Sequence, residues 1–69
     1  MRISARNQLA GTIIAIEDGA VTSIVTIRLD GGETVVSSIT RGSVENLGLE
    51  IGRPVLAVIK STDVMVAIE

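Results

Sequence analysis

The chain has 69 residues, a formal net charge of −2, and no cysteine, histidine or aromatic residue. This composition allows one small domain and excludes disulfides, thiolate or imidazole metal sites and a histidine general base. It also argues against nucleic-acid binding, which uses basic grooves and aromatic stacking.

Hydrophobic residues make up 46% of the chain. One small core cannot bury so large a fraction, so we expect the chain to associate with copies of itself; the alternative is a monomer with an apolar surface. No apolar run reaches the roughly 18 residues of a membrane span. Residues 1–4 have no apolar stretch behind their charge, so we expect no signal peptide and a cytoplasmic location.

Three strands are predicted in the first part of the chain. Residues 7–17 are rich in β-branched side chains, and Gly11 within them indicates a bend, a bulge or a close backbone approach. Residues 21–30 alternate between apolar and polar types, as a strand covered on one face does. Residues 34–39 form the third strand. Turns containing Asp-Gly separate the three.

A short helix is predicted within residues 40–49, where the apolar period changes. Thr40 or Ser43 can cap its N-terminus, and Gly48 stands where a helix commonly ends.

Two apolar runs at the end of the chain, 55–59 and 64–68, are predicted as further strands joined by a hairpin at 60–63. The order of elements predicts an all-β fold, a five-stranded OB-like Greek-key barrel with one short helix between strands 3 and 4. We expect a single domain spanning residues 1–69.

The residues that could carry chemistry favour binding over catalysis. Serine and threonine hydroxyls are present, but there is no obvious base to activate them, so we do not expect an enzyme. Two polar clusters stand out, residues 4–8 and 60–62. Arg6 supplies a planar fork of donors and Lys60 a compact cation, a combination that suits a small oxyanion. Further donors at the helix start, between Thr40 and Ser43, could close such a site.

Three motifs carry a family resemblance. They are Ser4-Ala5-Arg6-Asn7-Gln8-Leu9-x-Gly11, Ser43-Val44-Glu45-x-Leu47-Gly48 and Val58-Ile59-Lys60-Ser61-Thr62-Asp63-Val64-Met65. Together they closely resemble the molbindins, cytoplasmic molybdate- and tungstate-binding proteins built from a single Mop domain. The resemblance implies an OB-like barrel that assembles as a homohexamer, a trimer of dimers, with oxyanions held between subunits. It implies storage or homeostasis of molybdate, and also tungstate, as the function.

The resemblance also implies the ligand residues. One half of the principal site corresponds to Ser4, Ala5 (through its backbone N–H) and Arg6, and the other half, from an adjacent subunit, to Thr40, Ser43, Lys60 and Ser61. A second class of site, near the three-fold axis, would involve the turn at 19–22. Arg41-Gly42 departs from the family pattern, which often has an acidic residue there.

Two other functions stay open at this point. The polar clusters could serve only as caps and turns of a structural or regulatory oligomerisation module without ligand. Alternatively, the barrel could be a nucleic-acid-binding OB module, although the composition argues against it. Neither a catalytic cofactor nor a directly bound metal cation is expected.

Overall fold

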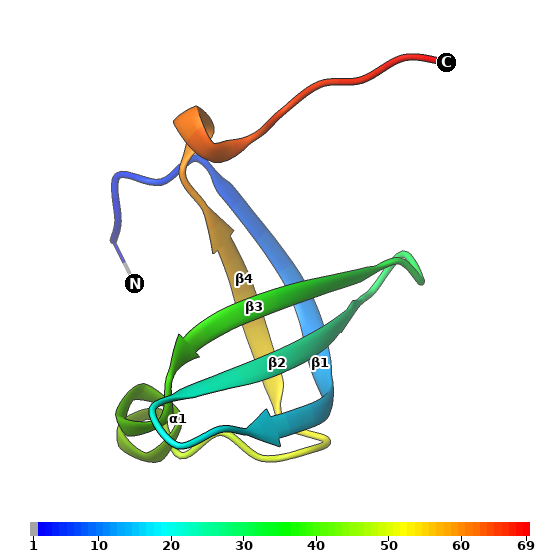
Figure 1. The fold of residues 1–69 in the computed structure, drawn as a ribbon. Coiled ribbons are helices and arrows are strands. Elements are labelled where there is room, and N and C mark those ends of the chain that lie inside the picture. Colours follow the sequence, from blue (N-terminus) through cyan, green and yellow to red (C-terminus); the bar gives the residue numbers. More distant parts are fainter. Residues whose placement is uncertain (1) are drawn as a thin grey trace.

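The structure is a computed structural model that describes residues 2–69; Met1, part of the segment considered for a signal peptide, lies outside the described residues. Four antiparallel strands form one sheet in the order β3-β2-β1-β4. Figure 1 shows a strongly curved sheet in which β1 and β4 cross β2 and β3. The strands are β1 Asn7–Asp18, β2 Thr22–Leu29, β3 Thr34–Thr40 and β4 Pro54–Ile59; helix α1, Arg41–Leu47, follows β3, and the 3₁₀ turn η1, Ser61–Asp63, follows β4.

The long strand β1 belongs to two ladders. Its first half pairs with β4 and its second half with β2, and the two ladders overlap only at Gly11 and Thr12. The register with β2 shifts between Ile13 and Ala15, a bulge of the kind that bends a strand. A Cβ atom on Gly11 would lie 2.5 Å from the carbonyl oxygen of Arg28. The close backbone approach that the sequence suggested at Gly11 is therefore present.

Helix α1 is capped at both ends by the residues that the sequence indicated. Thr40 Oγ1 accepts a hydrogen bond from the backbone N–H of Ser43 at 3.1 Å. Gly48 adopts the left-handed conformation (φ 63°), and its N–H donates to the carbonyl of Glu45. The helix places Val44 in the core.

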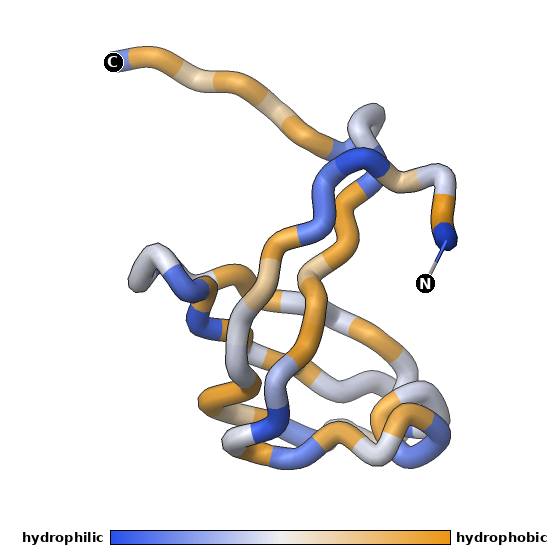
Figure 2. Tube along the Cα trace, turned by 180° about the vertical axis from the view of Figure 1, so that it is seen from behind, coloured by the Kyte–Doolittle hydropathy of each residue, from blue (hydrophilic) through white to orange (hydrophobic). Residues whose placement is uncertain are grey.

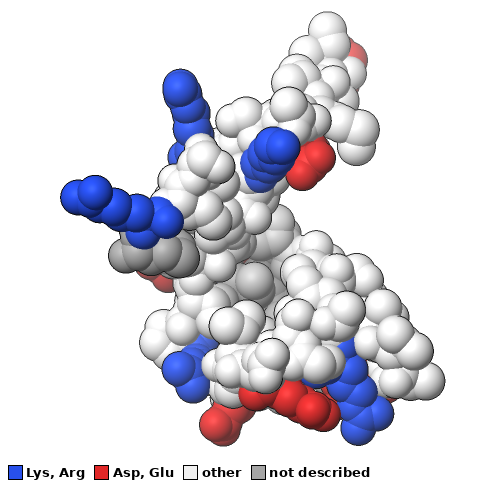
Figure 3. Space-filling model, turned by 90° about the vertical axis from the view of Figure 1, so that its left-hand side faces the viewer, with Lys and Arg blue, Asp and Glu red and all other residues white. Residues whose placement is uncertain are grey.

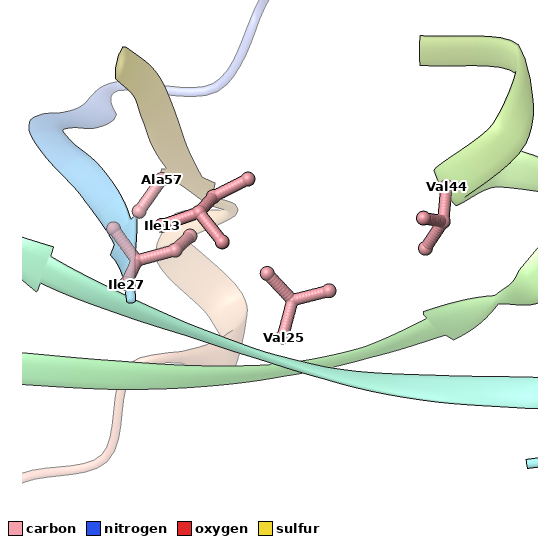
Figure 4. Close-up of a cluster of buried hydrophobic side chains, with 5 residues drawn as sticks. All are labelled: Ile13, Val25, Ile27, Val44 and Ala57. Atoms are coloured by element: carbon pink, nitrogen blue, oxygen red, sulfur yellow. The ribbon is translucent and has the colours of Figure 1, made fainter. Parts of the chain in front are cut away.

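The buried core is small and aliphatic. Figure 4 shows Ile13, Ile27 and Ala57 pointing toward one another from β1, β2 and β4. Val25 of β2 lies between this group and Val44, which projects from helix α1. The hydroxyl of Ser23, also buried, donates to Asp18 Oδ1 at 2.6 Å, so this polar group is satisfied.

The predicted fifth strand is wrong for the single chain. Residues 64–69, which we call the tail, form no ladder within the described part of the chain, and residues 60–63 contain a 3₁₀ turn where a hairpin was predicted. Figures 1 and 2 show the largely hydrophobic tail extending away from the sheet. A short apolar run rich in β-branched residues favours an extended backbone. A strand also needs a partner edge, and the described part of this chain does not bring one to its own tail. The described residues thus form a curled four-stranded sheet with β3 and β4 at its edges, and the fifth strand that would close a barrel is not formed by this chain alone.

Candidate functional site

The strand register brings the two polar clusters to one end of the molecule. Residues 4–6 immediately precede β1, and Lys60 and Ser61 immediately follow β4. Because β1 and β4 run antiparallel with Asn7 opposite Ile59, both clusters leave the ladder at the same end. Figure 1 shows the N-terminal segment and η1 together there. We call this end, formed by residues 2–6 and 60–63, the cluster end.

Two side-chain amides tie the cluster end together. Asn7 Nδ2 donates to the carbonyl of Ile59 at 3.2 Å, and this bond connects the segments that carry the two clusters. Gln8 Nε2 donates to the carbonyl of Ala5 at 3.1 Å within the first segment. The candidate ligand side chains themselves are exposed, namely Ser4, Arg6, Lys60 and Ser61, and are accessible to a ligand.

The cluster end is basic although the chain as a whole is acidic. Three of the six basic residues, Arg2, Arg6 and Lys60, belong to it, whereas Asp63 is its one carboxylate among eight in the chain. Figure 3 shows basic side chains gathered around the N-terminal segment and η1. A local excess of positive charge attracts anions and raises their concentration at the surface.

The structure places the two remaining candidates elsewhere. Thr40 pairs with Thr22, beside the pair formed by Ser23 and Asp18 at the far end of β1. A strand of 12 residues therefore separates Thr40 and Ser43 from the cluster end. Within one chain, Lys60 and Ser61 lie beside the Ser4–Arg6 segment. They lie far from Thr40 and Ser43, although the resemblance places these four residues in the same half of the site. A site that contains all seven candidates requires a second chain.

Thr40 and Ser43 already have a role inside the chain. Their hydroxyl oxygens lie 2.8 Å apart, in addition to the cap bond from the Ser43 N–H. Thr40 is exposed and Ser43 half-buried, so both hydroxyls keep lone pairs or a rotatable proton for a further partner.

Arg41 links the start of α1 to the turn before β2, a contact that the sequence alone did not indicate. Its N–H donates to the carbonyl of Val21 at 2.9 Å, and its Nη1 donates to the carbonyl of Gly19 at 3.5 Å. Its Nε also lies 3.9 Å from Glu45 Oε1, an exposed pair of small energetic weight. The turn at 19–22, predicted to take part in a second class of site, therefore adjoins the helix start.

Across residues 2–69 there is no group of three or more carboxylate, histidine or cysteine side chains that could hold a metal ion. Neither does any helix in that range have the length and apolar character to cross a membrane. Apart from Asp63, the polar side chains at the cluster end are positive or neutral donors, and these are the groups that bind anions.

The model of the TOBE domain family matches residues 3–66, nearly the whole chain.

The chain belongs to the TOBE domain family.

Within this family it is similar to proteins of the Mop type, which confirms the resemblance to single-domain molbindins. It is 46% identical over 69 residues to a probable molybdenum-pterin-binding protein of Haemophilus influenzae, and the match covers all of both chains. The structure of MopII from Clostridium pasteurianum, 45% identical, superposes with a TM-score of 0.92 and covers 97% of this chain and 100% of MopII. The cytoplasmic molybdate-binding protein ModG with molybdate bound is 48% identical over 88% of this chain and 43% of ModG, with a TM-score of 0.85.

Proposed function

We propose that this TOBE-domain protein binds molybdate, and also tungstate, as a reversible store in the cytoplasm. The observation that carries the proposal is the convergence of Arg6 and Lys60, with the donors of Ser4, Ala5 and Ser61, at one end of the β1–β4 ladder. The names of its relatives point to the same ligand class. ModG, which is described as a cytoplasmic molybdate-binding protein, supports both molybdate as the ligand and the cytoplasm as the location. We take residues 1–69 as one such domain.

The chemistry of the cluster suits a tetrahedral dianion. A guanidinium offers two parallel N–H donors, an ammonium offers a compact charge, and hydroxyl and backbone N–H groups supply shorter-range donors. Two cations balance the two negative charges, which removes the penalty of an unpaired charge when water is excluded. The proposed action is capture and release without catalysis or a catalytic cofactor.

The proposed site is completed by a second chain. Thr40 and Ser43 cannot reach Lys60 of their own chain, so their contribution requires that the helix start of one copy approaches the cluster end of another. This arrangement agrees with a homohexamer, a trimer of dimers, with oxyanions between subunits. The Gly19–Thr22 turn, which Arg41 holds against the helix start, is the place proposed for the second class of site.

The surface of the single chain supports self-association. A groove of about 990 Å³ opens onto the core residues Ile13, Val25 and Ala57, and its rims include β3 and β4, the two outer strands of the sheet. In the tail, Met65, Val66 and Ile68 are 94%, 89% and 95% exposed. Apolar surface of this kind is rarely left in water, and an edge strand accepts a further strand. We propose that the tail of a second copy occupies the groove between β3 and β4.

The test is titration of the assembled protein with molybdate by isothermal calorimetry, together with native mass spectrometry before and after addition. We expect a hexamer that gains molybdate masses. Arg6→Ala, and separately Lys60→Ala with Ser61→Ala, should weaken binding by at least about tenfold, because each loses a charge-assisted hydrogen bond. Arg28→Ala is the matched control, since Arg28 is an exposed arginine of β2 outside the cluster end. Unchanged titrations in both site variants would refute the assignment.

A structural oligomerisation module is the second candidate, and the Thr40–Ser43 cap bonds favour it because they use both hydroxyls without any ligand. A thermal-shift panel separates the two functions. A ligand that binds only the folded assembly raises its melting temperature, so molybdate should stabilise the protein more than equal concentrations of sulfate or phosphate. A module without ligand would show the same small response to all three.

A further inference from the structure

The side chain of Asn7 stands where the two polar clusters meet. Its Nδ2 donates to the carbonyl of Ile59 at 3.2 Å, and the bond joins residues 52 positions apart in the sequence. Asn7 and Ile59 are also the last pair of the β1–β4 ladder, after which each segment continues directly into its cluster. One half-buried carboxamide thus connects the two segments at the point where their backbones separate.

Two physical effects work against alignment at this point. Arg6 and Lys60, the next residues beyond the pair, carry charges of the same sign, and like charges on neighbouring strands repel. The end of a ladder also opens more readily than its middle, because the outermost pair has a neighbour on one side only. A side-chain hydrogen bond to the last carbonyl opposes both effects. Without it, the two cations would tend to move apart in the absence of an anion.

We propose that Asn7 is a positioning residue of the oxyanion site, which holds Ser4–Arg6 beside Lys60–Ser61 before any ligand arrives. The proposal rests on the molybdate binding proposed for these clusters. A site whose donors are already aligned binds more tightly, because less conformational freedom is lost on binding. Asn7 therefore acts on affinity through Arg6 and Lys60, and its own carboxamide remains on the Ile59 carbonyl.

The neighbouring amide supplies a matched control. Gln8 carries the same functional group and also donates to a backbone carbonyl, but its partner, Ala5, is three residues away in the same exposed segment. Loss of the Gln8 bond leaves the two segments joined. Asn7→Ala and Gln8→Ala therefore remove the same kind of bond, and only the first removes a link between the clusters.

Calorimetric titration of the assembled variants with sodium molybdate tests the proposal. Asn7→Ala should weaken molybdate binding by about tenfold, the upper range for one neutral hydrogen bond, and Gln8→Ala by less than about threefold. Asn7→Asp should weaken binding further than Asn7→Ala, because its carboxylate repels both the Ile59 carbonyl and the oxyanion. The melting temperature of each ligand-free variant is measured in parallel.

A double-mutant cycle with Lys60→Met distinguishes positioning from a purely structural role. If Asn7 positions Lys60, removal of the lysine should cost less affinity in the Asn7→Ala background than in the original protein. Independent effects, or an Asn7→Ala variant that melts earlier but binds molybdate with unchanged affinity, would overturn the proposal. An original protein that takes up no molybdate would instead refute the proposed function and the positioning role together, so the two failures are distinguishable.

Discussion

Truncation of one side chain in the tail tests how the apolar groove is filled. Along an extended segment, side chains alternate between two faces, so Val64, Val66 and Ile68 share one face and Met65 lies on the other. Ile68 is 95% exposed in the single chain. We expect the face of Val64, Val66 and Ile68 to pack on the core of a second copy, because it is entirely branched and apolar.

The expected magnitude follows from the side-chain carbons removed. Ile68→Ala deletes three carbon groups at about 0.8 kcal/mol each, or about 2.4 kcal/mol for one fully buried tail. A reciprocal dimer contains two tails, so its dissociation should become easier by about 5 kcal/mol, on the order of a few thousandfold in the dissociation constant.

Dilution series followed by native mass spectrometry or light scattering measure this constant. Met65→Ala is the control, since Met65 is 94% exposed in the same tail but lies on the opposite face. An Ile68→Ala protein that stays assembled at the same dilution as the original protein would refute the proposed occupant of the groove. Equal losses in the two variants would refute the proposed choice of face.

Two further predictions concern stability. Gly11→Ala should destabilise the fold by about 3 kcal/mol, because the new Cβ would meet the Arg28 carbonyl oxygen at 2.5 Å, and urea denaturation measures the loss. Gly32→Ala is the control: nothing lies within 4 Å of its new Cβ, and its φ of +102° should cost only about 1 kcal/mol. Equal losses in the two variants would contradict the argument from close approach at Gly11. Thr40→Ala should cost about 1 kcal/mol of folding stability through loss of the cap bond from the Ser43 N–H, whereas Thr40→Ser should retain most of the stability. Circular dichroism during thermal unfolding compares the two variants. A serine variant as unstable as the alanine variant would count against the cap.

The sequence predicted those elements whose cause is local. The alternation in residues 21–30 and the cap residues around α1 act within a few positions, so the observed bounds of β2 and of the helix lie close to the predicted ones. Gly11 was recognised because a glycine weakens the interior of a strand and is typical of places where the strand bends or another backbone comes close. In each case the determining interactions were readable from neighbouring residues.

The elements that sequence reasoning missed depend on partners distant in the chain or on another molecule. Residues 64–68 have the composition of a strand, but pairing decides whether a strand forms, and no edge of the same chain meets them within residues 2–69. The separation of Thr40 from Lys60 likewise follows from the strand register, which no short motif encodes. The Arg41 contact with Gly19 spans 22 positions and has no sequence signal that we can identify.

The sharing of β1 between two ladders has a consequence for folding. β2 and β3 form a hairpin with a short loop, and β1 joins β2 through another, so this half of the sheet closes over small separations in sequence. The β1–β4 ladder must instead bring together residues that lie 42 positions (Thr12 and Pro54) to 52 positions (Asn7 and Ile59) apart. Closing so long a loop costs more chain entropy, so this ladder forms more slowly. The end of the molecule that carries Arg6 and Lys60 is therefore the last to assemble and the first to open. An anion bound there stabilises the closed form of the part of the chain that depends most on contacts between distant residues.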